Sequence, residues 1–162
     1  DKDGNLQLPE GVTPLSLLQR AVREILTEKG LDVSGLTQNQ MSDYQYWLLF
    51  PNVFMQVRSG DATVITAEPH LSGDPNRSTW RVIALQWLPP EQREAQRTEL
   101  TEIAEGDHFP YFLALEQDYV QMAIQQRGLR NSALEYQTLT RQEPKLAHFH
   151  AALERWYEHE PA

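Results

Sequence analysis

Cysteine is absent from the 162 residues of this chain. Its absence excludes disulfide bonds and any metal centre that depends on thiolate ligands from within the chain. No apolar run approaches the roughly 20 residues that a membrane-spanning helix requires. The first residues show neither the basic nor the hydrophobic region of a secretory signal. We therefore expect no membrane partner and a cytoplasmic location.

Basic residues are scarce, because 14 lysines and arginines face 23 aspartates and glutamates and leave a net charge of −9. Phosphate contacts require clustered Lys and Arg, so we expect no nucleic-acid partner. The hydrophobic fraction of 40% is ordinary for a soluble protein, and the chain is long enough for one core. Residues 1–162 are expected to form a single domain or a fragment of one.

The first helix is predicted to follow Thr13 and to end near Gly30. Thr13 suits the N-cap and Pro14 suits the first helical position. Six apolar residues recur at helical spacing and predict a face that packs against a sheet. They are Leu15, Leu17, Leu18, Ala21, Val22 and Ile25.

Four strands are predicted over residues 44–50, 53–57, 62–68 and 78–88, which are rich in aromatic and β-branched side chains. Pro51 separates the first two because proline cannot sit inside a central ladder. Ser59, Gly60 and Asp61 form a tight-turn signal, so the second and third strands are expected to make a hairpin.

The remaining chain is predicted to be helical. Residues 91–105 are highly charged and are expected to be an exposed helical stretch. A helix is expected over residues 110–126, ended by Gly128. Another begins near Gln142, with Pro144 in its first turn, and should bury one side. That side carries Leu146, Phe149, His150, Leu153 and Tyr157. Antiparallel strands followed by long helices indicate the α+β class.

The helix expected over residues 110–126 places a carboxylate where the pattern predicts burial. Asp118 shares a stripe with Tyr111, Leu115 and Met122. An unpaired buried charge costs several kcal/mol or forces protonation. A metal ion, a cationic or hydrogen-bonding neighbour, or a helix less buried than its pattern suggests would each account for this position.

The histidines offer no clear ligand pair. His148 and His150 lie two residues apart on a predicted helix, so their side chains point about 200° apart and cannot chelate one ion. His70 and His108 are expected in loops, where a lone histidine is usually solvated. We assign none of them as a metal ligand.

The order of several short segments resembles that of a known family. LLFPN at residues 48–52 precedes EQD at 116–118, QQRGLRNS at 125–132, QE at 142–143 and FH at 149–150. This order is similar to the C-terminal part of the catalytic domain in the alpha subunit of Rieske-type non-haem iron oxygenases, the aromatic-ring-hydroxylating family. The resemblance implies a partial helix-grip, START-like fold, in which a curved antiparallel sheet has flanking and C-terminal helices.

The resemblance also implies that Asp118 is the carboxylate ligand of a mononuclear Fe(II), whose other two ligands are histidines. The family's His-x4-His element is absent, as are the Cys- and His-containing elements of the [2Fe-2S] Rieske domain. We therefore expect a C-terminal fragment of an oxygenase catalytic domain, with the Rieske domain absent. The enzymatic activity implied belongs to the parent protein, and remains uncertain for this chain alone.

In the parent, the resemblance implies hydroxylation of an aromatic or related small organic substrate with O₂. Electrons would come from NAD(P)H through a reductase or ferredoxin and the [2Fe-2S] cluster, and the full subunit would assemble as a trimer. Tyr111, Phe112, Leu115 and Met122 are candidates for the wall of the substrate pocket, although apolar stripes at helical spacing are more often ordinary core.

Competing interpretations stay open. A START-like domain without a metal could serve as a non-enzymatic binding module for an apolar small molecule. Residues 91–105 or the last helix could instead form a contact between subunits. From the pattern alone, Asp118 is more often a solvated residue, or one paired with Arg127 or Arg130, than a metal ligand.

Overall fold

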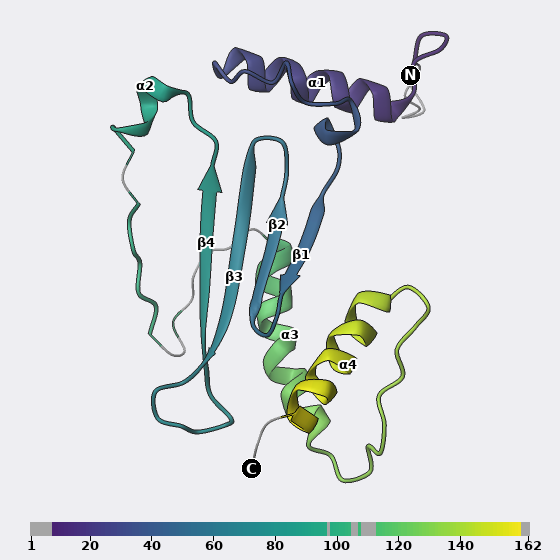
Figure 1. Ribbon diagram of the computed structural model, residues 1–162, viewed down its shortest axis with the longest axis vertical. Helices are drawn as coiled ribbons and strands as arrows, with labels where there is room; N and C mark the ends of the chain where they lie inside the picture. The colour runs from purple at the N-terminus through teal and green to yellow at the C-terminus, as the bar shows by residue number, and fades with distance from the viewer. Residues whose placement is uncertain (1–7, 97, 105–106, 108–112, 160–162) are drawn as a thin grey trace. The chain divides into compact units, whose positions relative to one another are not determined.

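The computed structural model describes residues 8–96, 98–104, 107 and 113–159 (Figure 1). The chain forms two compact units, Asp1–Arg97 and Thr98–Ala162, called here the N-terminal and the C-terminal unit. The N-terminal unit contains one long helix, a short 3₁₀ helix, an antiparallel sheet and a short helix. The C-terminal unit contains two long helices.

Helix α1 spans Pro14–Glu28, as predicted. Its first turn is fixed by a capping box, in which the Thr13 hydroxyl accepts from the backbone N–H of Ser16 at 3.1 Å. The Ser16 hydroxyl oxygen accepts in return from the backbone N–H of Thr13 at 3.0 Å. These two bonds satisfy N–H groups that have no partner within the helix, and Pro14 has no N–H to satisfy.

The buried face of α1 differs from the predicted one. Leu15, Leu18 and Ile25 are about half exposed, whereas Leu26, outside the predicted stripe, is only 7% exposed. The core cluster joins Leu26 to buried residues that follow the helix, with Val22 and Leu36 packed against them. Those buried residues are Leu31, Val33 and Met41. The prediction that the stripe packs on a sheet was wrong, because the chain after α1 folds back onto the Leu26 side instead.

Two polar side chains of α1 hold this returning segment, which includes the 3₁₀ helix η1 (Asn39–Met41). The Arg23 guanidinium donates to the carbonyl oxygens of Val33 at 2.8 Å and Leu36 at 2.7 Å. The buried Gln19 amide donates to the Ser42 hydroxyl at 2.9 Å. The guanidinium thus pairs the carbonyl oxygen of Leu36 and gives a second donor to that of Val33, which also accepts from the backbone N–H of Leu36 at 3.1 Å.

The sheet contains β1 (Gln45–Leu49), β2 (Val53–Val57), β3 (Asp61–Pro69) and β4 (Ser78–Gln86), in that spatial order and all antiparallel. The four strands and the β2–β3 hairpin are confirmed. Residues paired across neighbouring strands lie on the same face. One face therefore carries the row Trp47, Met55, Val64 and Ile83, and the other carries Leu48, Phe54, Ile65 and Val82. Both faces are apolar, yet none of these eight side chains is buried.

Helix α1 crosses one end of the sheet, beside the β2–β3 turn (Figure 1). The approach is close at Gly60, where an added Cβ would lie 2.6 Å from Leu26 Cδ2. A side chain at position 60 would require the Leu26 side chain to shift. Glycine at position 60 therefore lets the hairpin contact the core cluster.

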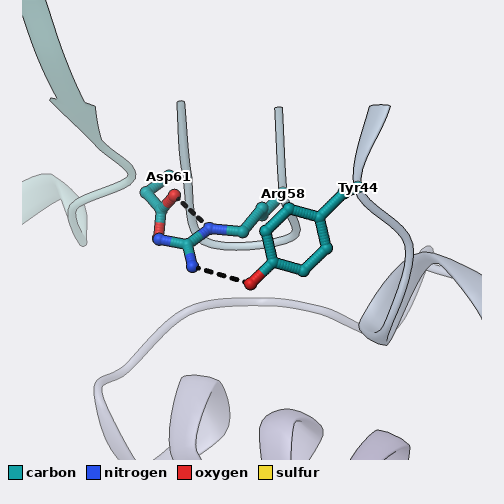
Figure 2. Close-up of polar contacts among 3 residues, drawn as sticks. All are labelled: Tyr44, Arg58 and Asp61. Atoms are coloured by element: carbon teal, nitrogen blue, oxygen red, sulfur yellow. Dashed lines mark hydrogen bonds and ion pairs between the residues drawn. The ribbon is translucent and has the colours of Figure 1, made fainter. Parts of the chain in front are cut away.

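Arg58 and Asp61 close the β2–β3 turn (Figure 2). The Arg58 Nε and Nη2 atoms each lie 2.6 Å from an Asp61 carboxylate oxygen, and Nη1 lies 3.2 Å from the Tyr44 hydroxyl oxygen. The hydrogen bond to Asp61, followed by that to Tyr44, raises the pKa of Arg58 above its ordinary value. This cluster links the start of β1 to the hairpin, and the Arg-Ser-Gly-Asp order was its overlooked signal in the sequence.

The charged stretch after the sheet is less helical than predicted. Helix α2 spans only Pro90–Arg93, and residues 98–104 contain no helix or strand. Leu100, an apolar residue of this stretch, is 79% exposed. Without an apolar face to pack, charge and propensity alone do not sustain a helix here.

The C-terminal unit contains α3 (Leu113–Leu129) and α4 (Pro144–His159), which confirms two closing helices. Residues 110–112, where α3 was predicted to begin, lie outside the described residues. Gly128 does not end α3 but lies within it, one residue before the end. The predicted buried side of α4 is also wrong at Leu146, His150 and Tyr157, which are exposed, whereas Phe149 and Leu153 are partly buried.

Together the four-stranded antiparallel sheet and the long helices confirm the α+β class. In the part of the chain that the structure describes, no helix has the length and apolar character needed to cross a membrane.

Candidate metal-binding helix

Helix α3 positions Asp118, the residue predicted to bind iron. The helix is continuous from Leu113 to Leu129, so Leu115, Asp118 and Met122 recur at positions i, i+3 and i+7 along one side. The burial expected for this side is found only in part. Leu115 is buried at 8% exposure, whereas Asp118 is exposed and Met122 is 43% exposed.

The reason lies in the distribution of apolar residues around α3. Val120 and Ile124 face other directions than Leu115 and are each about half exposed. A helix with apolar side chains around its circumference has no single face that the pattern can mark as buried. Of the explanations left open for Asp118, this structure shows a helix that is less buried at this position than its pattern suggests.

The Asp118 carboxylate has no hydrogen-bond or ion-pair partner among the residues that the structure describes. Pairing with Arg127 is ruled out by helix geometry. The two residues are nine positions apart on α3, which corresponds to about 13 Å along the axis. The oxygens of Asp118 are therefore exposed and available as ligands on a regular helix.

Potential partners for a metal site are dispersed. His148 and His150 both lie on α4 and are exposed, and His70 lies in the β3–β4 loop with Nδ1 at 2.7 Å from the Ser72 hydroxyl oxygen. His108 is outside the described residues. Among those described, no group of three or more His, Cys, Asp or Glu residues could hold a metal ion. The described chain thus offers one carboxylate and does not by itself fit a complete two-histidine, one-carboxylate iron site.

The predicted substrate-pocket residues are only partly described. Tyr111 and Phe112 lie outside the described residues, while Leu115 and Met122 lie on the same side of α3 as Asp118. The pocket stays a prediction. A cavity beside α1 was overlooked in the sequence, although Ser16, Arg20 and Arg23 recur at helical spacing.

Comparison with known proteins identifies the family. Residues 17–159 match the family described as ring hydroxylating alpha subunit (catalytic domain). The match begins within α1 and extends to the end of α4, and so reaches further toward the N-terminus than the first of the short segments that carry the resemblance, residues 48–52. No curated protein and no solved structure matches the chain significantly. The chain belongs to the family of catalytic domains of ring-hydroxylating alpha subunits.

Proposed function

We propose that this chain forms part of the catalytic subunit of an oxygenase that hydroxylates an aromatic or related small organic compound with O₂. The observation that supports the proposal most strongly is the family match over residues 17–159. Membership implies an oxygenase subunit, and therefore an oxidoreductase, for the protein to which the chain belongs.

Asp118 is the residue proposed to act at the metal. Its carboxylate is exposed and lies on a regular part of α3. Two neutral imidazoles and one carboxylate suit Fe(II) and leave coordination positions open on one face. Because no histidines of the described residues join Asp118 in a group that could hold a metal ion, we propose that the imidazoles come from elsewhere in the complete protein. The role of Asp118 is to supply one anionic oxygen ligand at a fixed position.

The proposal also covers the substrate contacts and the source of electrons. Leu115 and Met122, with Tyr111 and Phe112, would contribute apolar contacts for the substrate near Asp118. Electrons would reach the iron from NAD(P)H through a reductase or ferredoxin and a [2Fe-2S] Rieske cluster bound outside this chain. We propose a trimer for the complete subunit.

Iron content provides the test, measured in the longest natural polypeptide that contains this chain. Asp118→Ala should remove the mononuclear iron while the spectrum of the Rieske cluster is retained, because the cluster does not depend on this ligand. Asp118→Asn should also weaken iron binding, since a neutral amide is a poorer ligand than a carboxylate. Glu154→Gln on α4 is the matched control, because it removes one exposed helical charge at another position.

Full iron and full turnover in Asp118→Ala would refute the ligand assignment. A wild-type polypeptide that binds no iron would instead favour the competing proposal, non-enzymatic binding of an apolar small molecule. That alternative is supported by the two apolar faces of the sheet, whose central residues remain partly accessible. It predicts saturable binding of an apolar fluorescent probe to the iron-free protein.

A further inference from the structure

A cavity of about 310 Å³ lies beside α1 in the N-terminal unit. It is lined by Val12, Ser16, Arg20, Arg23 and Gln38. Ser16, Arg20 and Arg23 lie on one side of α1, at positions i, i+4 and i+7. Two guanidinium groups thus border one small cavity in a chain whose net charge is −9.

Arg23 is held in place by the backbone. Its Nη1 and Nη2 atoms donate to the carbonyl oxygens of Val33 and Leu36 at 2.8 and 2.7 Å. These acceptors are neutral, so they fix the orientation of the guanidinium without cancelling its charge. No carboxylate of the described residues lies within ion-pair distance of Arg23. A positive charge is therefore positioned at the cavity wall before any ligand arrives.

Arg20 is held by fewer contacts than Arg23. Its Nε lies 4.0 Å from a Glu24 carboxylate oxygen, and both side chains are more than 60% exposed, at 62% and 65%. A contact at this distance and exposure restrains the guanidinium weakly. The planar N–H groups of Arg20 are consequently available for a ligand in the cavity.

The other residues that line the cavity indicate which ligand chemistry it can accept. Gln38 precedes η1, and its exposed side chain makes no capping hydrogen bond, so its amide can donate into the cavity. The Ser16 hydroxyl instead donates to the carbonyl oxygen of Thr13 at 2.9 Å, within the N-terminal cap. Val12 supplies an apolar surface. The site combines cationic donors, one amide and an apolar wall.

We propose that this cavity binds a small monocarboxylate that carries a short apolar group. A guanidinium presents parallel N–H donors that match the two oxygens of a carboxylate. The apolar group would lie against Val12. The volume of 310 Å³ is at the lower end of the range of about 300–1,000 Å³ typical of ligand sites. A ligand of only a few carbon atoms therefore fits.

The test uses the iron-free form of the longest natural polypeptide that contains this chain. Sodium butyrate is titrated at constant ionic strength, and binding is followed by the broadening of its proton NMR signals. Butyramide, which has a similar shape without the charge, should bind much more weakly than butyrate. Inorganic phosphate serves as the second comparison, because it is anionic but has no apolar group.

Two variants locate the site without disturbing Arg23, whose hydrogen bonds support the fold. Arg20→Gln should weaken butyrate binding about tenfold, the loss expected for one charge-assisted hydrogen bond. Gln38→Glu should weaken it at least as much, because it places a negative charge at the wall. Arg141→Gln, an exposed position in the C-terminal unit, should leave the affinity unchanged.

Three outcomes would overturn the proposal. Butyramide binding as tightly as butyrate would remove the role of the charge, and phosphate binding as tightly as butyrate would remove the monocarboxylate class. Unchanged butyrate affinity in both Arg20→Gln and Gln38→Glu would place the binding elsewhere in the protein.

Discussion

The helix α1 region and the sheet of the N-terminal unit are built differently. Residues 13–43 combine a capped helix, a returning segment and a small core in which Leu26, Val33 and Met41 are buried. The sheet has a regular antiparallel register over all four strands, yet the central residues of both faces remain partly exposed. Strands can therefore pair along their whole length although their side chains are only partly buried. The reason is that the register depends on backbone hydrogen bonds and on the alternation of side chains between the two faces.

The largest predicted effect is the difference in the free energy of unfolding between one substitution in the α1 region and one in the sheet. Leu26→Ala should lower the free energy of unfolding by about 2–5 kcal/mol, because it removes a buried side chain from the core cluster. Leu48→Ala in β1 should cost about 1 kcal/mol or less, since Leu48 is 48% exposed. Urea denaturation of the two variants measures the difference. Equal losses would mean that the sheet is as tightly packed as the helix region.

A smaller loss of stability is expected from a substitution at the contact between the β2–β3 turn and α1. Gly60→Ala places a Cβ 2.6 Å from Leu26 Cδ2 and should cost about 1–3 kcal/mol of stability, because Leu26 is enclosed by the core and has little room to move. Gly35→Ala is the control, since an added Cβ there meets no atom within 4 Å.

Combining Gly60→Ala with Leu26→Ala sharpens the test. The truncated residue 26 leaves space for the new methyl group, so the double variant should be more stable than the sum of the two single effects predicts. Strictly additive losses would show that the turn does not approach α1 as closely as the structure indicates.

The features predicted correctly from the sequence are those determined by neighbouring residues. The Thr13 cap, the separation of β1 and β2 at Pro51 and the turn at Gly60 all follow from local chemistry, and each is present. Burial was predicted less well. Leu26 was missed because its burial depends on a segment that returns from residues 31–41, which the periodicity of α1 does not reveal.

The same limit applies to the candidate site. The helix that carries Asp118 was predicted, but its buried side was not, since α3 has apolar residues around its circumference. The family was recognised from the order of short segments, which reflects common ancestry and not folding energetics. Periodicity could not indicate that Asp118 would be exposed, because exposure depends on what packs against the helix.

The smallest effect concerns the returning segment at acidic pH. Hydrogen bonds from the Ser34 hydroxyl and then from the Ser34 backbone N–H, the latter at 3.0 Å, lower the pKa of Asp32 below its ordinary value of 3.8. A carboxyl whose pKa is depressed by folding stabilises the native state above its unfolded pKa. That contribution is lost as the pH falls through the folded pKa.

Asp32→Asn should therefore reduce stability slightly at about pH 6 and should have less effect at about pH 3, which lies below the ordinary pKa of 3.8, where this contribution is being lost. The free energy of unfolding at the two pH values measures the difference. Asp43→Asn removes the same charge without the Ser34 hydrogen bonds, and so controls for net charge. If Asp32→Asn became more damaging as the pH fell, the sign of the linkage would be wrong. The ionised Asp32 carboxylate would then not stabilise the α1 region.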